Sequence, residues 1–310
     1  MKLQKPKFWS KKNSFYSFLL LPISIFIQFL FFFKKEFSKR KKISLPVICV
    51  GNIYIGGTGK TPLSLELVRI LQKLNMKPVL IKKLYKEHVD EFNLLESKKI
   101  KVIKNSSRYE ALLEAEKKQF KSVVLDDGFQ DHSIYKNLSI LCFNAKQLIG
   151  NGLTLPAGPL REPLSTIKYS QIILINGKKN EIFEKKLKSI NKNIKIFYSR
   201  YVPINIKKYL NQNLLVFAGI GNPENFFELL RENKMRIKKQ ISFPDHYNYS
   251  QNEIKNLITI SKKKGLKILT TEKDFFRIKH YNLSKINYLN IKLEITNKVS
   301  FEKEIKKYLK

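Results

Sequence analysis

The chain has 310 residues, of which 43% are hydrophobic, and a formal net charge of +35 at pH 7. This length suits two domains, and the apolar content excludes a globally disordered chain. Of the 60 basic residues, 52 are Lys and 8 are Arg, and the Lys residues are scattered over the whole chain. A nucleic-acid reader more often clusters its charge on one element with Arg prominent, so we expect no nucleic-acid partner. The two cysteines, Cys49 and Cys142, form neither a disulfide framework nor a zinc spacing, and both lie in apolar runs typical of buried, reduced thiols.

The first element is an uncharged apolar segment over residues 15–33, with Lys-rich flanks on both sides. As a helix it would span about 28 Å, close to the ~30 Å core of a bilayer. A cleaved signal peptide is disfavoured because no small-residue cleavage site follows. A spanning anchor, a helix lying in one leaflet with a kink at Pro22, and a buried core helix stay open. We favour membrane association and expect residues 1–42 to form a membrane-associated helix with basic flanks.

Short apolar strands then alternate with helices over residues 43–200. This pattern predicts a mostly parallel sheet covered by helices on both faces. A second α/β set follows residue 200 and predicts a smaller domain over residues 201–310. The strand candidates of the first set are 46–50, 78–81, 100–103, 122–125, 139–143 and 171–175, and its helices include 62–74 and 108–118.

A glycine-rich turn joins the strand 46–50 to the helix 62–74, which is the context that a phosphate loop requires. Its glycines allow backbone N–H groups to converge on phosphate oxygens, Lys60 can reach the β- and γ-phosphates, and the Thr61 hydroxyl can bind Mg²⁺. The usual G-x-x-x-x-G-K-[ST] pattern has Gly where this chain has Tyr54. The loop predicts nucleoside triphosphate binding but leaves the reaction open. The expected nucleotide-binding residues are Asn52, Gly56, Gly57, Thr58, Gly59, Lys60, Thr61 and Gln130.

An apolar strand ends in the carboxylate pair Asp126 and Asp127. Active sites of parallel sheets form at the carboxyl ends of the strands, and a carboxylate there holds the metal or its waters. The alternative is a surface turn of the Asp-Asp-Gly type.

Five runs occur in order along the chain: GGTGKTP (56–62), DDGFQ (126–130), LPAGPLREPLS (155–165), FPDHY (243–247) and TTEKD (270–274). In order and spacing they resemble the tetraacyldisaccharide 4'-kinases of lipid A biosynthesis over nearly the whole chain. The resemblance implies ATP- and Mg²⁺-dependent phosphorylation of the 4'-hydroxyl of a tetraacylated glucosamine disaccharide 1-phosphate. It also implies a P-loop domain, a smaller α/β domain that closes the active-site cleft, and a membrane-bound lipid substrate. The expected location is the cytoplasmic face of the inner membrane of a Gram-negative-type bacterium, with no obligate protein partner.

The resemblance also implies residue roles. Asp90 matches the family's general base, although the Gly and Pro that flank it in the family are absent here, and a solvated loop carboxylate is the alternative. His246, in the intact FPDHY run, is expected to orient that carboxylate. Of the family's Ser-Arg-Gly-Tyr run only Tyr85 is kept. Arg108 and Arg161 are expected to neutralise phosphate charge.

The expected metal-binding residues are Thr61, Asp126, Asp127 and Glu162. His132 receives no role, and the TTEKD run, residues 270–274, is expected to be structural or close to the nucleotide. Two other classes compete with the kinase: a membrane-bound nucleotide switch and a nucleic-acid-dependent ATPase. The switch lacks the Asn-Lys-x-Asp run of guanine recognition, and the ATPase has only the net charge in its favour.

Overall fold

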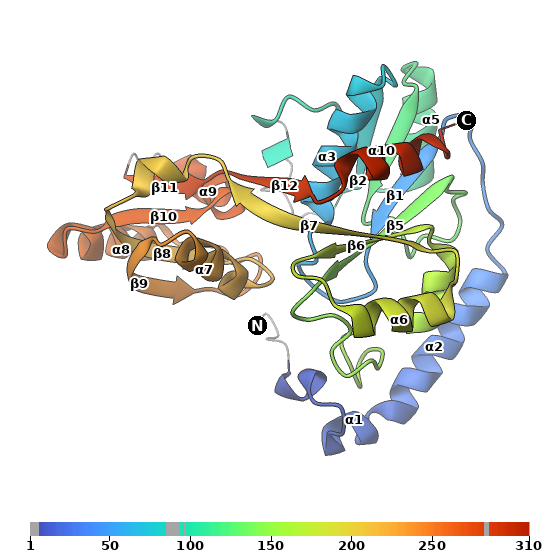
Figure 1. Ribbon diagram of the computed structural model, residues 1–310, viewed down its shortest axis with the longest axis horizontal. Coiled ribbons are helices and arrows are strands. Elements are labelled where there is room, and N and C mark those ends of the chain that lie inside the picture. The colour runs from blue at the N-terminus through green and yellow to red at the C-terminus, as the bar shows by residue number, and fades with distance from the viewer. Residues whose placement is uncertain (1–5, 85–93, 96, 282–284, 310) are drawn as a thin grey trace. The chain divides into compact units, whose positions relative to one another are not determined.

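The structure, a computed structural model, describes residues 6–84, 94–95, 97–281 and 285–309 (Figure 1). The chain divides into two compact units. The larger unit comprises 5–84, 100–200 and 293–310, and the smaller unit comprises 201–292 with the described part of 85–99. Residues 293–310, which the sequence analysis assigned to the smaller domain, therefore lie in the larger unit. The reason is packing: helix α10 (Lys298–Lys306) buries Phe301 against Phe197, with 5.1 Å between the ring centroids.

The larger unit is built on an eight-stranded sheet in the order β12-β7-β6-β5-β1-β4-β2-β3 (Figure 1). The pairings among β1 to β7 are parallel. The central strands are buried along their whole length and mostly apolar, because both faces of the sheet are covered. The strands are β1 (Val47–Gly51), β2 (Pro78–Lys83), β3 (Val102–Asn105), β4 (Ser122–Asp126), β5 (Leu138–Asn144), β6 (Ile172–Asn176), β7 (Lys195–Pro203) and β12 (Ile291–Ile295).

The helices of this unit include α3 (Lys60–Lys73), α5 (Arg108–Lys117) and α6 (Glu181–Ile190). Strand β1 lies between β4 and β5, and its Val50 pairs with Asp126 at the end of β4. Because the two strands are parallel, the loops that follow both of them leave the same edge of the sheet. The two cysteines are buried free thiols of this sheet.

The smaller unit has a four-stranded sheet in the order β11-β10-β8-β9, with parallel pairings. Its strands are β8 (Asn213–Ala218), β9 (Arg236–Ser242), β10 (Lys267–Thr271) and β11 (Ile286–Leu289). Alternate residues of β8 enter two separate apolar clusters. One cluster includes α7 (Pro223–Glu232) and the other includes α8 (Gln251–Lys263), so helices cover both faces. A third helix, α9 (Glu272–Ile278), directly follows β10.

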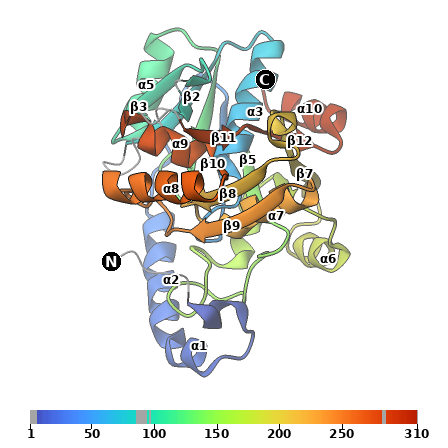
Figure 2. The ribbon, with the colours of Figure 1, turned by 90° about the vertical axis from the view of Figure 1, so that its left-hand side faces the viewer.

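The apolar N-terminal segment forms two helices, α1 (Phe15–Leu19) and α2 (Leu21–Glu36), after a short 3-10 turn at Lys7–Ser10 (Figure 2). The break falls at Leu20, where Pro22 in the first turn of α2 lacks an N–H but suits a helix start. In the described part of the chain, no helix combines the length and apolarity needed to cross a bilayer. Aromatic side chains cover the outer surface of both helices, and Phe18, Phe26 and Phe29 are 76%, 61% and 57% exposed.

Candidate active site at the phosphate loop

The glycine-rich turn after β1 has the backbone of a phosphate loop. Gly56 and Gly59 adopt φ values of 101° and 95°, which residues with a side chain rarely adopt, and Gly59 caps the start of α3. Lys60 and Thr61 therefore occupy the first turn of a helix, where N–H groups and the helix dipole attract anions. This arrangement is able to bind the phosphates of a nucleotide.

Tyr54, which replaces the usual glycine, lies in backbone that needs no glycine. It forms an antiparallel bridge with Leu160, and Ile55 N–H donates to the Pro159 carbonyl at 2.9 Å. Tyr54 itself is buried, and its φ is not positive. The departure from the usual pattern therefore reflects a short pairing between residues 53–55 and 159–161.

Asn52 and Gln130 brace this loop through its backbone. The Asn52 amide donates to the carbonyl oxygens of Tyr54 and Gly56, at 2.5 and 3.2 Å. The Gln130 amide donates to the Asn52 carbonyl at 2.8 Å. Asn52 is fully buried, so its side chain supports the loop from beneath. Both residues were predicted to bind nucleotide; in this structure, their side chains contact the loop.

Asp126 is a buried carboxylate with three side-chain donors. Thr61 and Ser64 donate their hydroxyl groups at 3.1 and 3.2 Å, and Lys82 Nζ lies 2.8 Å from Oδ2. Lys82, at the end of β2, is itself 7% exposed. Lys82 was not among the residues predicted to belong to the site. The signal in the sequence that could have identified it is a lysine directly after an apolar strand run.

Asp127 lies between two cations. Its carboxylate is 3.0 Å from Arg161 Nη1 and 3.6 Å from Lys60 Nζ, and its backbone has a left-handed φ of 58°. Burial alone would raise the pKa of Asp127, but the charges of Lys60 and Arg161 outweigh it and hold the pKa below the ordinary 3.8. For Lys60, burial lowers the pKa more than the nearby Asp127 raises it. The predicted residues Lys60, Asp127 and Arg161 are thus brought into one charged cluster.

This cluster predicts a specific acid sensitivity. An Asp whose pKa is lowered on folding stabilises the fold above its unfolded pKa and loses that contribution as the pH falls through the folded value. We therefore expect Asp127→Asn to lose less stability than wild type when the pH is lowered from about 6 to about 2.5. Thermal unfolding across this range measures the difference, with Glu114→Gln on the solvent-facing side of α5 as the control. If the unfolding temperatures of Asp127→Asn and wild type fell in parallel as the pH was lowered, the lowered pKa of Asp127 would be contradicted.

Arg108 and His132 hold the loop that follows the carboxylate pair. Arg108 donates to the Asp127 carbonyl at 2.6 Å and lies 3.3 Å from the Asp131 carboxylate. His132 Nε2 is 3.1 Å from Glu162 Oε1. Arg108, predicted to contact phosphates, is here bonded to protein acceptors. His132, to which the sequence analysis assigned no role, contacts a predicted metal ligand.

The oxygen donors of the cluster suit magnesium. Mg²⁺ is usually bound through one or two carboxylates together with substrate phosphates and water. The Thr61 hydroxyl and the Asp126 carboxylate are in contact, and Glu162 Oε2 is a buried oxygen with no hydrogen-bond partner among the described residues. In the same residues, no group of three or more His, Cys, Asp or Glu forms a ready-made cage. The predicted ligands therefore fit an ion that is held jointly with a nucleotide.

In the smaller unit, the FPDHY and TTEKD runs meet. His246 has a left-handed φ of 55°, its N–H donates to the Gly219 carbonyl, and Lys273 Nζ lies 3.0 Å from His246 Nε2. Asp274 is fully buried and accepts hydrogen bonds from the Gly219 N–H and the Tyr249 hydroxyl. The predicted base Asp90 and the predicted Tyr85 lie outside the described residues.

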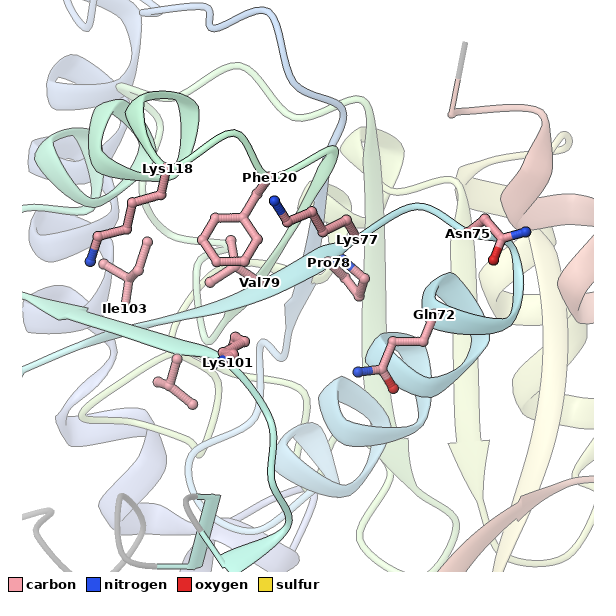
Figure 3. A pocket seen from close by; sticks show the side chains of 10 residues that line it. Gln72, Asn75, Lys77, Pro78, Val79, Lys101, Ile103, Lys118 and Phe120 are labelled. Carbon is pink, nitrogen blue, oxygen red and sulfur yellow. The ribbon is translucent and has the colours of Figure 1, made fainter.

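A cavity of about 710 Å³ lies away from this cluster, at the amino ends of β2 and β3 (Figure 3). Lys77, Lys101, Lys118 and Phe120 line it together with Gln72 and Asn75, at the end of α3 and in the turn that follows. The phosphate loop is at the start of α3, so this cavity belongs to the opposite edge of the sheet.

Comparisons with known proteins agree with one another. The family model LpxK, tetraacyldisaccharide-1-P 4'-kinase, matches residues 16–99 and 90–310. The tetraacyldisaccharide 4'-kinase of Pelagibacter ubique (strain HTCC1062) is 43% identical over 301 residues, which cover 96% of this chain and 95% of that protein. The one from Rickettsia bellii (strain OSU 85-389) is 32% identical and covers 99% of both chains. A crystal structure of the "apo" form of LpxK from Aquifex aeolicus in complex with ATP is similar with a TM-score of 0.72 and 26% identity, over 95% of this chain and 99% of that one.

Proposed function

The chain belongs to the tetraacyldisaccharide-1-P 4'-kinase family, and we propose that it transfers the γ-phosphoryl group of ATP to the 4'-hydroxyl of a tetraacylated glucosamine disaccharide 1-phosphate. The product is the 4'-phosphorylated lipid A precursor, lipid IVA. The observation that carries the proposal is the cluster in which Lys60, Arg161 and the carboxylates of Asp126 and Asp127 meet at the phosphate loop.

Each residue of the cluster has a separate proposed role in phosphoryl transfer. Catalysis of this reaction is mostly positioning and charge stabilisation. Lys60 and the N-terminus of α3 would bind the β- and γ-phosphates, and Arg161 would stabilise charge on the transferring group. Asp127 holds these two cations beside the phosphate loop, with Lys60 Nζ 3.6 Å and Arg161 Nη1 3.0 Å from its carboxylate.

Thr61, Asp126, Asp127 and Glu162 are the proposed Mg²⁺-binding residues. When bound, the ion would neutralise charge on the phosphate oxygens. The Thr61–Asp126 hydrogen bond supports this assignment, as does Glu162 Oε2, for which the described part of the chain offers no hydrogen-bond partner.

The acceptor side of the reaction needs a base. In the transfer, a bond forms between the 4'-oxygen and the γ-phosphorus, and the bond from the γ-phosphorus to the β–γ bridging oxygen breaks, leaving its electron pair on ADP. The hydroxyl proton passes to a carboxylate, for which we keep Asp90 as the proposed acceptor. His246 is proposed to orient that carboxylate, and Lys273, which contacts His246 Nε2, makes Nε2 a hydrogen-bond acceptor.

A kinase assay tests the proposed function. Purified full-length protein, ATP, Mg²⁺ and a detergent-dispersed tetraacylated disaccharide 1-phosphate should give the 4'-phosphorylated lipid, detected by thin-layer chromatography and mass spectrometry. Folded protein that forms no product with this acceptor would overturn the proposal. Replacing ATP with GTP separates the kinase from a guanine-nucleotide switch.

We also propose that α1 and α2 lie in one leaflet of the cytoplasmic membrane. Their exposed face is largely aromatic, whereas Ser17 and Ser24 are the buried ones among the described side chains of α1 and α2. This is the reverse of a helix packed on a protein core, and such an aromatic face is suited to the acyl region of a bilayer. Basic residues at Lys11, Lys12 and 39–42 flank the helices and complement anionic headgroups.

Replacing part of this face should release the protein from membranes. Burying one Phe contributes about 1.5–3 kcal/mol, so Phe26→Asp with Phe29→Asp should weaken vesicle binding by at least about tenfold. Co-sedimentation with phosphatidylethanolamine and phosphatidylglycerol vesicles measures the change. Ile182→Asp is the matched control, because Ile182 is an apolar side chain on α6 that is 84% exposed. If Ile182→Asp lost as much vesicle binding as the double variant, or if the double variant lost none, this placement of the helices would be contradicted.

A further inference from the structure

The aromatic N-terminal helices carry a narrow polar seam, formed by Ser17, Ser24 and Gln28, on the side that faces the protein. Ser17 and Ser24 are 2% and 0% exposed, and Gln28 is half-buried. Figures 1 and 2 show α1 and α2 beside the loops that follow β5. The hydrogen bonds of the seam lead to one segment of those loops, residues 151–161, which we call the bracket loop.

Four directional hydrogen bonds join the seam to the bracket loop. The Ser24 hydroxyl donates to the Thr154 carbonyl at 3.1 Å and accepts from the Ala157 N–H at 2.9 Å. The Gln28 amide donates to the Thr154 hydroxyl at 2.7 Å, and the Asn151 amide donates to the Ser17 hydroxyl at 3.0 Å. The helices are therefore attached to this loop in one register.

Trp9 adds two further bonds from the turn that precedes α1. Its indole N–H donates to the Pro156 carbonyl at 3.0 Å, and its own carbonyl accepts from the Asn151 N–H at 2.8 Å. Contacts to the bracket loop thus extend along the N-terminal segment from Trp9 to Gln28.

The other end of the bracket loop is bonded to the phosphate loop. Pro159 accepts from Ile55, one residue before Gly56, and the Arg161 N–H donates to the Ile53 carbonyl at 2.6 Å. Arg161 then reaches Asp127 with its side chain. The loop is closely packed at Gly158, where a Cβ would lie 2.2 Å from Asn151 Oδ1.

A purely apolar face would have been sufficient if α2 only anchored the chain. Buried polar groups contribute little net stability, but they cost free energy when their partners are lost, and their bonds fix one geometry. The polar seam is therefore better suited to fixing the position of α1 and α2 on the protein than to increasing their affinity for it.

We propose that Ser24 and Gln28 are positioning residues for phosphoryl transfer: through the bracket loop they hold Arg161 and the phosphate loop in register with the helix that lies in the membrane. The inference rests on the proposed function and on the proposed membrane placement of α2. Its consequence is that membrane attachment and catalytic alignment share one element, so a lipid acceptor and the phosphates are presented to each other at a set depth.

The test uses Ser24→Ala, Gln28→Ala and Gln28→Glu in the full-length protein. The control is Ser10→Ala, because the Ser10 hydroxyl is exposed and, among the described residues, bonds to the Lys7 carbonyl of its own turn. Activity is measured with the acylated disaccharide 1-phosphate in phosphatidylethanolamine and phosphatidylglycerol vesicles.

A displacement of about 1 Å in catalytic groups can cost a hundredfold in rate. We expect the two Ala variants to lose roughly tenfold or more in kcat. Their KM for ATP and their vesicle binding should stay unchanged. Gln28→Glu should recover activity, because a carboxylate accepts a bond from the Thr154 hydroxyl.

Three outcomes would overturn the inference while leaving the proposed function intact, provided that wild type is active. The first is that both Ala variants keep the kcat of wild type. The second is that the Ala variants lose vesicle binding in proportion to their loss of activity. The third is that they lose both ATP binding and the folded state. Failure of wild type to phosphorylate the disaccharide would instead overturn the proposed function.

Discussion

Lys60→Ala is expected to lower kcat/KM by about 10²–10³-fold, which is the usual effect of removing one preorganised group that stabilises transition-state charge. Lys60 is the cation in the first turn of α3, and its side chain is 14% exposed. Its stability effect should be small, because burial already disfavours the charged amine, as its lowered pKa indicates, and Arg161 still pairs with Asp127. Steady-state kinetics with varied ATP, together with thermal unfolding, measure both quantities.

The matched control is Lys73→Ala, in the last turn of the same helix, where the side chain is exposed. This variant should keep wild-type kinetics. If Lys60→Ala kept more than about a tenth of wild-type kcat/KM, the phosphate loop would not be the centre of transfer.

Asp126→Asn is expected to remove activity and to destabilise the larger unit at the same time. Removing one member of a buried ion pair typically costs about 3–5 kcal/mol. Here Lys82 Nζ lies 2.8 Å from the lost carboxylate. Thr61 donates to Oδ2 and Ser64 to Oδ1, so Asn keeps an acceptor for one of these hydroxyls and its amide group can donate to the other. We therefore expect a cost of about 3 kcal/mol.

A second substitution separates the two effects. Lys82→Met in the Asp126→Asn background should restore part of the stability, since the buried charge is removed, but no activity. Urea unfolding and the kinase assay follow the two quantities independently. Glu114→Gln, which breaks the exposed pair with Lys118 on α5, is the control and should cost less than about 1 kcal/mol. Recovery of activity in the double variant would contradict a metal-binding role for Asp126.

The parallel sheet of the larger unit and the location of its nucleotide loop followed from local pattern. Apolar strands such as 122–125, with turns of Gly and Asp after them, can be recognised because each signal lies within a few residues. Tyr54 shows the limit of this approach: its mismatch to the motif is explained by pairing with Leu160, which is distant in sequence. The same holds for Lys82 and Asp126, since only the order of strands places β2 beside β4.

The sequence by itself determined the kinase family and the parallel α/β pattern, because motifs and apolar periodicity are local properties of the chain. Only the tertiary structure decided that 293–310 packs in the larger unit, that the apolar segment breaks at Leu20, and that His132 contacts Glu162. It alone also places Ser24 against the bracket loop. These features depend on contacts between residues far apart in sequence, and such contacts form only when a specific packing satisfies buried polar groups that no local pattern records.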